Sequence, residues 1–215
     1  MFVIARLVAA KDLRIEFRTR VLLWQVLPFA LGALLLFGLA FGPNVARLRA
    51  AAPGVVYVVE VLTALLVIGR SRAHETAPGT ATSVRMLGLD PAGVYLGKTV
   101  ALFVVLATTA LVIDGGAGLF FHVGWQQVLT SLPSLLVAVL AMAAAGTTYG
   151  ALTGAGAGAA TLLPILVLPA FAPTLLAGIE LFRHPGASHW WGLLVFSTVA
   201  YGGVGLLLYG VVEEL

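Results

Sequence analysis

Residues 21–42 read VLLWQVLPFALGALLLFGLAFG, a run of 22 residues without a charged side chain. The hydrocarbon core of a bilayer is about 30 Å thick, so about 20 apolar residues cross it as a helix that rises about 1.5 Å per residue. The run therefore predicts a membrane-spanning helix. Five more runs of this kind follow, separated by charged, aromatic or glycine-rich stretches, at residues 53–69, 93–113, 128–149, 159–179 and 190–212.

The composition agrees with a membrane protein and excludes an ordinary soluble domain. Of the 215 residues, 60% are hydrophobic and 10% are charged, and the mean hydropathy is +1.06. A soluble chain has about a quarter of its residues charged. We therefore expect an all-α polytopic membrane protein whose six transmembrane helices form a single domain over residues 1–215.

Several classes of chemistry are absent from the sequence. There is no cysteine, which excludes disulfides, thiolate metal sites and cysteine nucleophiles. The sequence contains neither a phosphate-binding loop nor a nucleophile elbow, so we expect no enzyme activity of its own. The net charge of +3 is not concentrated in a basic groove motif, and we expect no nucleic-acid partner.

The basic residues are distributed unevenly between the two sides of the predicted membrane domain. If the amino terminus is inside, the inner side carries nine of them and the outer side three, and an excess of Lys and Arg marks the cytoplasmic side. We therefore expect both termini to be cytoplasmic. The inner residues are Arg6, Lys11, Arg14, Arg18, Arg20, Arg70, Arg72, Arg85 and Lys98, and the outer ones are Arg47, Arg49 and Arg183.

Residues 1–20 predict an amphipathic helix at the membrane interface. Apolar residues recur at three- and four-residue spacing, and most charged residues fall on the other side. Two interpretations stay open, a surface anchor that sets the topology or a platform for a cytoplasmic partner. No short apolar run with a cleavage motif follows, so we expect no cleaved signal peptide.

Glu60 is the strongest candidate for a functional side chain within a predicted span. An ionised group at the centre of a bilayer costs about 2.5–3.5 kcal/mol on insertion scales, so Glu60 must pair, become protonated or face a cavity. It is either a structural group, paired with Arg47 or Arg49 or hydrogen-bonded as a neutral acid, or a carboxylate of a substrate or proton path. Asp114 and Glu180 fall at predicted outer ends of spans, where we expect ordinary boundary charges.

The histidines do not form a metal-binding motif. His122, His184 and His189 all fall on the predicted outer side, but their spacing matches no known ligand set. We expect neither a metal site nor a fixed cofactor.

Residues 70–92 are the longest polar segment between two spans, and we expect them to form a cytoplasmic coupling loop. Within this loop, residues 80–89 can form a short surface helix with Val84 and Leu87 on one side and Arg85 exposed. Such a helix would offer side chains to a partner protein. The candidate coupling surface consists of Arg70, Arg72, His74, Glu75, Arg85, Met86 and Leu87.

Several short segments follow one another in a recognisable order along nearly the whole chain. They are KDLRIEFR at residues 11–18, APGVVY at 52–57, Gly79, Met86-Leu87, Asp90-Pro91, Gly97-Lys98, and LPILVLP at 163–169 with Pro173. Their order resembles the haem exporter protein B (CcmB-like) family, the ABC transporter permease of cytochrome c maturation. In one respect the chain departs from the family, because the acidic residues that the family carries around Gly79 are reduced here to Glu75.

The resemblance implies a transport subunit of the bacterial inner membrane that works with a separate cytoplasmic ABC ATPase and with other membrane proteins of cytochrome c maturation. Haem would be cargo and not a resident cofactor. The work done would be either movement of haem itself or release of a haem chaperone. Because a six-span half encloses no path alone, we expect a homodimer within a larger complex.

Two other functions remain open from the residues alone, besides a purely structural scaffold. One is an ABC permease for another cargo, such as a lipid, a polysaccharide or a drug. The other is a proton-coupled secondary transporter that uses Glu60, although residues 21–113 and 128–212 show no internal symmetry of the kind such transporters carry.

Overall fold

The computed structural model describes residues 1–75, 90–153 and 159–214. Arg85, Met86 and Leu87 of the candidate coupling surface, and the helix predicted over residues 80–89, lie outside the described residues. For Arg72, His74 and Glu75 only the helical backbone is described.

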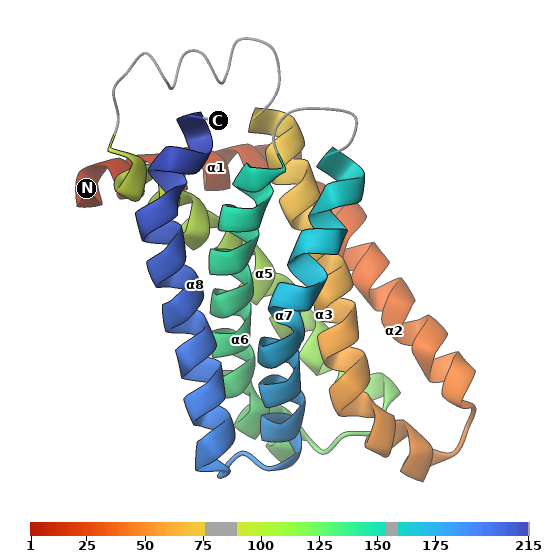
Figure 1. Ribbon diagram of the computed structural model, residues 1–215. Coiled ribbons are helices and arrows are strands. Elements are labelled where there is room, and N and C mark those ends of the chain that lie inside the picture. Colours follow the sequence, from red (N-terminus) through yellow and green to blue (C-terminus); the bar gives the residue numbers. More distant parts are fainter. Residues whose placement is uncertain (76–89, 154–158, 215) are drawn as a thin grey trace.

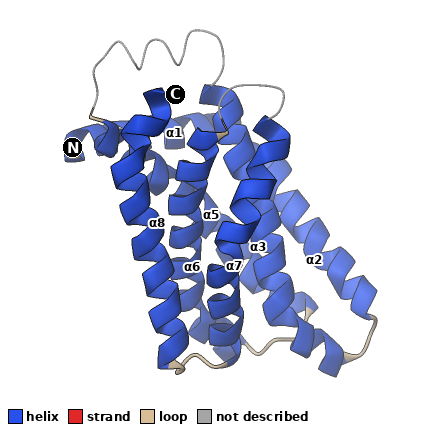
Figure 2. Ribbon diagram, in the orientation of Figure 1, coloured by secondary structure: helices blue, strands red, loops and turns tan. Residues whose placement is uncertain are grey.

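Helices make up nearly all of the described chain, and no strand appears in that part (Figure 2). Six of them are long and apolar enough to cross a membrane, which confirms the predicted fold class. The elements are α1 (Phe2–Thr19), the π-helical turn η1 (Leu22–Val26), α2 (Leu27–Phe41), α3 (Val45–Glu75), α5 (Pro91–Phe120), α6 (Trp125–Leu152), α7 (Ala159–Arg183) and α8 (Ser188–Glu214).

The outer surface of the bundle is apolar, as a lipid-facing surface must be. Every spanning helix exposes large hydrophobic side chains, while polar side chains such as Ser131 and Thr174 lie inside. In a soluble protein this arrangement would be strongly unfavourable, whereas lipid tails solvate it well. The exposed residues include Leu36, Leu39, Leu62, Leu111, Leu129, Ile165, Phe196 and Leu207.

Helix α1 lies across one end of the bundle, roughly perpendicular to the spanning helices (Figure 1). We call this end the α1 end. Both termini lie there, together with the last turns of α3, α6 and α8 and the first turns of α5 and α7. The helix predicted over residues 1–20 is therefore present, and its location at a membrane interface stays a prediction.

Several helices are longer than the uncharged sequence runs from which they were predicted. Helix α3 begins at Val45, where the Asn44 side chain accepts a hydrogen bond from the backbone N–H of Arg47 at 3.1 Å. It then continues through Pro53 to Glu75, so the first six residues of the predicted loop 70–92 are helical. A charged side chain ends an apolar run but not a helix, because Lys and Arg can extend toward the headgroups.

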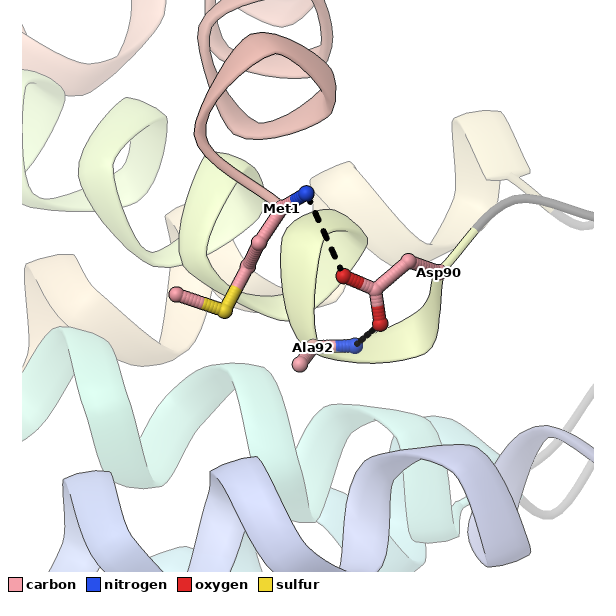
Figure 3. Close-up of polar contacts among 3 residues, drawn as sticks. All are labelled: Met1, Asp90 and Ala92. Atoms are coloured by element: carbon pink, nitrogen blue, oxygen red, sulfur yellow. Dashed lines mark hydrogen bonds and ion pairs between the residues drawn. The ribbon is translucent and has the colours of Figure 1, made fainter.

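Helix α5 begins at Pro91 and is capped by Asp90, which ties it to the start of α1. One carboxylate oxygen of Asp90 accepts from the N–H of Ala92 at 3.2 Å, and the other lies 3.5 Å from the Met1 nitrogen (Figure 3). A side-chain acceptor at this position satisfies one of the free N–H groups of the first turn.

Small residues allow the helices to approach closely at several crossings. A Cβ atom at Gly97 of α5 would lie 2.6 Å from the carbonyl oxygen of Ala5 in α1, and Gly93 is nearly as close to Met1. On α6, a Cβ at Gly146 would lie 2.5 Å from Ile68 of α3. Small residues commonly let membrane helices approach each other this closely.

Candidate functional site

Glu60 lies near the middle of α3 and is completely buried. Neither of its carboxyl oxygens has a hydrogen-bond partner among the described residues. Thr109 of α5 faces it, but the hydroxyl of Thr109 donates to the carbonyl oxygen of Leu106 at 2.8 Å. The carboxyl group therefore sits inside the bundle without a fixed donor.

Glu60 does not form an ion pair with Arg47 or Arg49 on the predicted outer side. Arg49 donates from Nε to the carbonyl oxygen of His122 at 2.7 Å, and Arg47 is exposed. Eleven residues separate Arg49 from Glu60 along α3, which corresponds to about 16 Å. That distance is too long for an ion pair, so of the structural interpretations only the neutral acid is left.

Tyr57 lies one turn before Glu60 on the same helix, and its ring packs directly against the backbone of α7. A Cβ atom built at Gly178 would lie 2.3 Å from Cε1 of the ring, so only glycine leaves room for it. The hydroxyl is completely buried and without a hydrogen-bond partner among the described residues. It points toward Ser134 of α6 and lies near both Glu60 and Asp114.

Asp114 is buried within α5, which corrects the expectation of a boundary charge at the end of the third span. Helix α5 continues for six more residues through a glycine-rich segment to Phe120, and α6 folds back beside it. Ser131 of α6 places its hydroxyl 3.1 Å from Oδ2 of Asp114 and 2.8 Å from the carbonyl oxygen of Val128. Glu180, by contrast, is a boundary charge as expected and pairs with Arg183 at 3.1 Å.

Together these side chains form what we call the buried polar cluster: Tyr57, Glu60, Asp114, Ser131 and Ser134. They come from three helices, α3, α5 and α6, and each is at most 1% exposed. The cluster contains two carboxyl groups and no Lys, Arg or His. Such a set can hold protons or water, and in a membrane bundle buried ionisable groups mark candidate functional sites.

At the α1 end, Arg70 is the one candidate coupling residue whose side chain is described. Its Nη1 donates to Oε1 of Gln25 at 2.6 Å, which connects the end of α3 to η1. Arg70 also lines a groove of about 120 Å³ between α1, α3 and α5, together with Lys11, Glu16 and Lys98. The groove is much smaller than the roughly 300–1,000 Å³ of typical ligand pockets.

The described histidines form no metal-binding set. His122 lies in the α5–α6 connection with a left-handed backbone conformation, and the ring of His189 contacts that of Trp190 with centroids 4.9 Å apart. Within the described ranges, no three His, Cys, Asp or Glu side chains gather as the ligands of a metal ion would.

Comparison with known proteins places this arrangement in a family. The family model described as CcmB protein matches residues 3–206, which is almost the entire chain. The chain belongs to the CcmB protein family. This confirms the resemblance drawn from its short segments, and every helix of the buried polar cluster lies inside the matched range.

Three curated CcmB-family relatives, each named heme exporter protein B, align with most of the chain. The protein of Haemophilus influenzae is 25% identical over 211 residues, covering 95% of this chain and 94% of the relative. That of Rhodobacter capsulatus is 30% identical over 182 residues, covering 83% and 82%. That of Paracoccus denitrificans is 28% identical over 177 residues, covering 82% and 81%.

Sequence reasoning found Glu60 but missed most of its surroundings. Asp114 is followed by Gly-Gly-Ala-Gly-Leu-Phe without a charge, so residues 93–120 could have been taken as one long span with Asp114 inside it. Ser131 and Ser134 are three residues apart, which puts both on one face of α6. For Tyr57, nothing in the sequence marks it out from other polar residues of a membrane helix.

Proposed function

We propose that this protein is the membrane permease subunit of a haem exporter. The observation that carries the proposal is the match to the CcmB family along residues 3–206, together with full-length relatives named heme exporter protein B. The six candidate spans account for most of the chain, and their residues contain no motif for nucleotide binding or hydrolysis. The protein would thus contribute a path or a moving part and not a reaction.

Energy would come from a separate cytoplasmic ATPase that docks at the α1 end. The candidate coupling residues belong to the end of α3 and to residues 76–89 that follow it. Helix α3 is continuous from Glu60 to Glu75, so a displacement of its last turn would be transmitted to the middle of the membrane domain. This rigid connection supports conformational coupling between a docked motor and the buried polar cluster.

The orientation and the assembly follow from the same proposal. A docked ATPase requires the α1 end, with both termini, to face the cytoplasm across a bacterial inner membrane, as the distribution of Lys and Arg also predicts. The groove of about 120 Å³ beside Arg70 is too small for a haem. We therefore expect the cargo path to open through a conformational change, or between two copies of the chain, within the cytochrome c maturation complex.

Two kinds of work fit this architecture: movement of haem across the membrane, or use of ATP to release a haem chaperone from its loading partner. Haem is cargo in the first and is handled by another subunit in the second. In neither is it a resident cofactor of this chain.

The proposal is tested by purifying the tagged protein from its native membrane in mild detergent and identifying the bound subunits. We expect an ATPase and further membrane proteins of haem handling to co-purify, and an Arg85→Glu variant to lose most of the ATPase. Arg47→Glu is the matched control, since it makes the same charge change at the opposite end and should leave the complex intact. Recovery of the protein alone, without nucleotide-dependent activity, would contradict the proposal.

A further inference from the structure

No described side chain forms an ion pair with either carboxyl group of the buried polar cluster. Several charged residues of the helices around Glu60 and Asp114 have other partners: Arg49 contacts the carbonyl of His122, Arg183 pairs with Glu180, and Arg70 donates to Gln25 at the α1 end. Arg47 is exposed near the start of α3, and Arg72, His74 and Glu75 belong to the last turns of that helix. The remaining titratable residues are Tyr57 within the cluster, and Tyr95, Lys98 and Tyr149 toward the α1 end, while η1 and α2 carry none.

An unpaired carboxylate in this position would be strongly unfavourable. Removing an ion from water into a low-dielectric interior costs several kcal/mol even after relaxation, and a group without a partner avoids that cost by becoming neutral. Glu60 is completely buried and both its oxygens lack a donor among the described residues. A carboxylic acid is the form of Glu60 that this environment accommodates.

Hydroxyl groups lie close to both acids. Thr109, which faces Glu60, lies five residues before Asp114 on α5, so the two acids differ by about 7–8 Å along that helix. The Tyr57 hydroxyl lies near both acids and beside Ser134, and Ser131 contacts Asp114. The hydroxyl of Tyr57 and Oδ1 of Asp114 have no partner among the described residues, although both side chains are fully buried. These free polar atoms point to something that binds here.

We propose that the buried polar cluster is an intramembrane proton-binding site, in which Glu60 holds the proton and the hydroxyls of Tyr57, Ser134 and Ser131 connect it to Asp114. Release breaks the O–H bond of the Glu60 carboxylic acid. The proton passes to a water molecule, and the carboxylate remains. In the described conformation the site is closed, so release requires a movement of α3 against α5 or α7 that admits water.

This site does not depend on the identity of the cargo or on the docking of an ATPase. It concerns the charge state of one side chain in the purified full-length protein. A negative result here would therefore leave the haem-exporter proposal standing, and failure of that proposal would leave the proton site intact.

Infrared spectroscopy of the protein in a maltoside detergent, which has no carbonyl of its own, tests the proposal directly. A protonated carboxyl group gives a carbonyl stretching band that an ionised one lacks, and the band moves on exchange into D₂O. We expect this band in the wild-type protein at neutral pH and its loss in Glu60→Gln. Identical spectra for the two proteins would overturn the proposal.

Two further variants complete the test. Glu180→Gln removes a carboxylate paired with Arg183 and should leave the band unchanged. Tyr57→Phe removes only one hydroxyl beside the acid, so it should shift the frequency of the band without abolishing it. If Glu60→Gln fails to fold, an unshifted band in Tyr57→Phe would still contradict the site as described.

Discussion

At the residue scale, the contact between Tyr57 and Gly178 fixes the geometry of the buried polar cluster. The ring fills the space that a side chain at position 178 would need, and its hydroxyl lies within the electrostatic reach of both carboxyl groups. Neither residue is remarkable in the sequence, because a tyrosine and a glycine in apolar segments are ordinary components of membrane helices. The contact between Tyr57 and Gly178 becomes apparent only in the folded structure.

Replacing Gly178 with alanine should destabilise the protein. The new Cβ atom would lie 2.3 Å from the ring of Tyr57, which is buried and cannot swing away, and overpacking of this kind costs about 1–3 kcal/mol. We expect a lower midpoint of thermal unfolding, measured by the loss of monodisperse protein in detergent. Gly202→Ala is the matched control, because nothing lies within 4 Å of a Cβ at that position. Equal midpoints for the two variants would contradict the packing described here.

Some residues of the buried polar cluster could be predicted from the sequence, and others could not. Glu60 could be found because a single acid stands in an otherwise uncharged run. A longer span could have included Asp114, but its burial could not be predicted, because it depends on α6 folding back beside α5 and supplying Ser131 from 17 positions away. The proposed pairing of Glu60 with Arg47 or Arg49 failed for a related reason, since α3 begins before both arginines and carries them away from Glu60.

At the scale of elements, the number and nature of the helices were predictable and their ends were not. Apolar runs as long as a bilayer is thick predict spanning helices without any knowledge of tertiary structure. The ends depend on caps and on charged side chains that continue the helix into water. Asn44 and Asp90 set the starts of α3 and α5, which lie eight and two residues before the predicted runs that begin at 53 and 93.

The crossing of α1 and α5 gives a prediction at this scale. We expect Gly97→Leu to displace α1, because any side chain there meets the backbone of Ala5 and the side chain of Val8. The chain contains no cysteine, so a cysteine introduced at Ala9, which is 8% exposed, reports the displacement through its reaction with a maleimide. The rate of the maleimide reaction should rise about tenfold or more, because the clash should destabilise the packing of α1 on α5 by about 1.4 kcal/mol or above. Gly32→Leu, in an open position on α2, should not change it.

At the scale of the whole molecule, the two ends of the bundle differ in charge. The α1 end carries the basic residues of α1 together with Arg70 and Lys98, while the opposite end carries Arg47, Arg49 and Arg183. The sequence predicted this division because both termini fall on one side after six crossings. It could not show that α1 lies across the bundle and packs on α5, since that contact depends on Gly93 and Gly97 meeting residues far away in the chain.

The orientation in the membrane can be tested with single cysteines. We expect Asn44→Cys, between α2 and α3 at the end opposite α1, to react with a membrane-impermeant maleimide in intact cells. Thr19→Cys, at the end of α1, should react only after the cells are opened. The reverse pattern would place the α1 end outside the cytoplasm and exclude a cytoplasmic ATPase docked there.

If the protein is the membrane subunit of a haem exporter, deleting its gene in the native bacterium should change the amount of haem that is covalently bound to c-type cytochromes. This amount can be measured in the deletion strain and in the wild type. We expect covalent haem to be lost, b-type haem to be retained as the sign that haem synthesis is intact, and the wild-type gene to restore the loss. An unchanged amount of covalent haem in the deletion strain would contradict the claim.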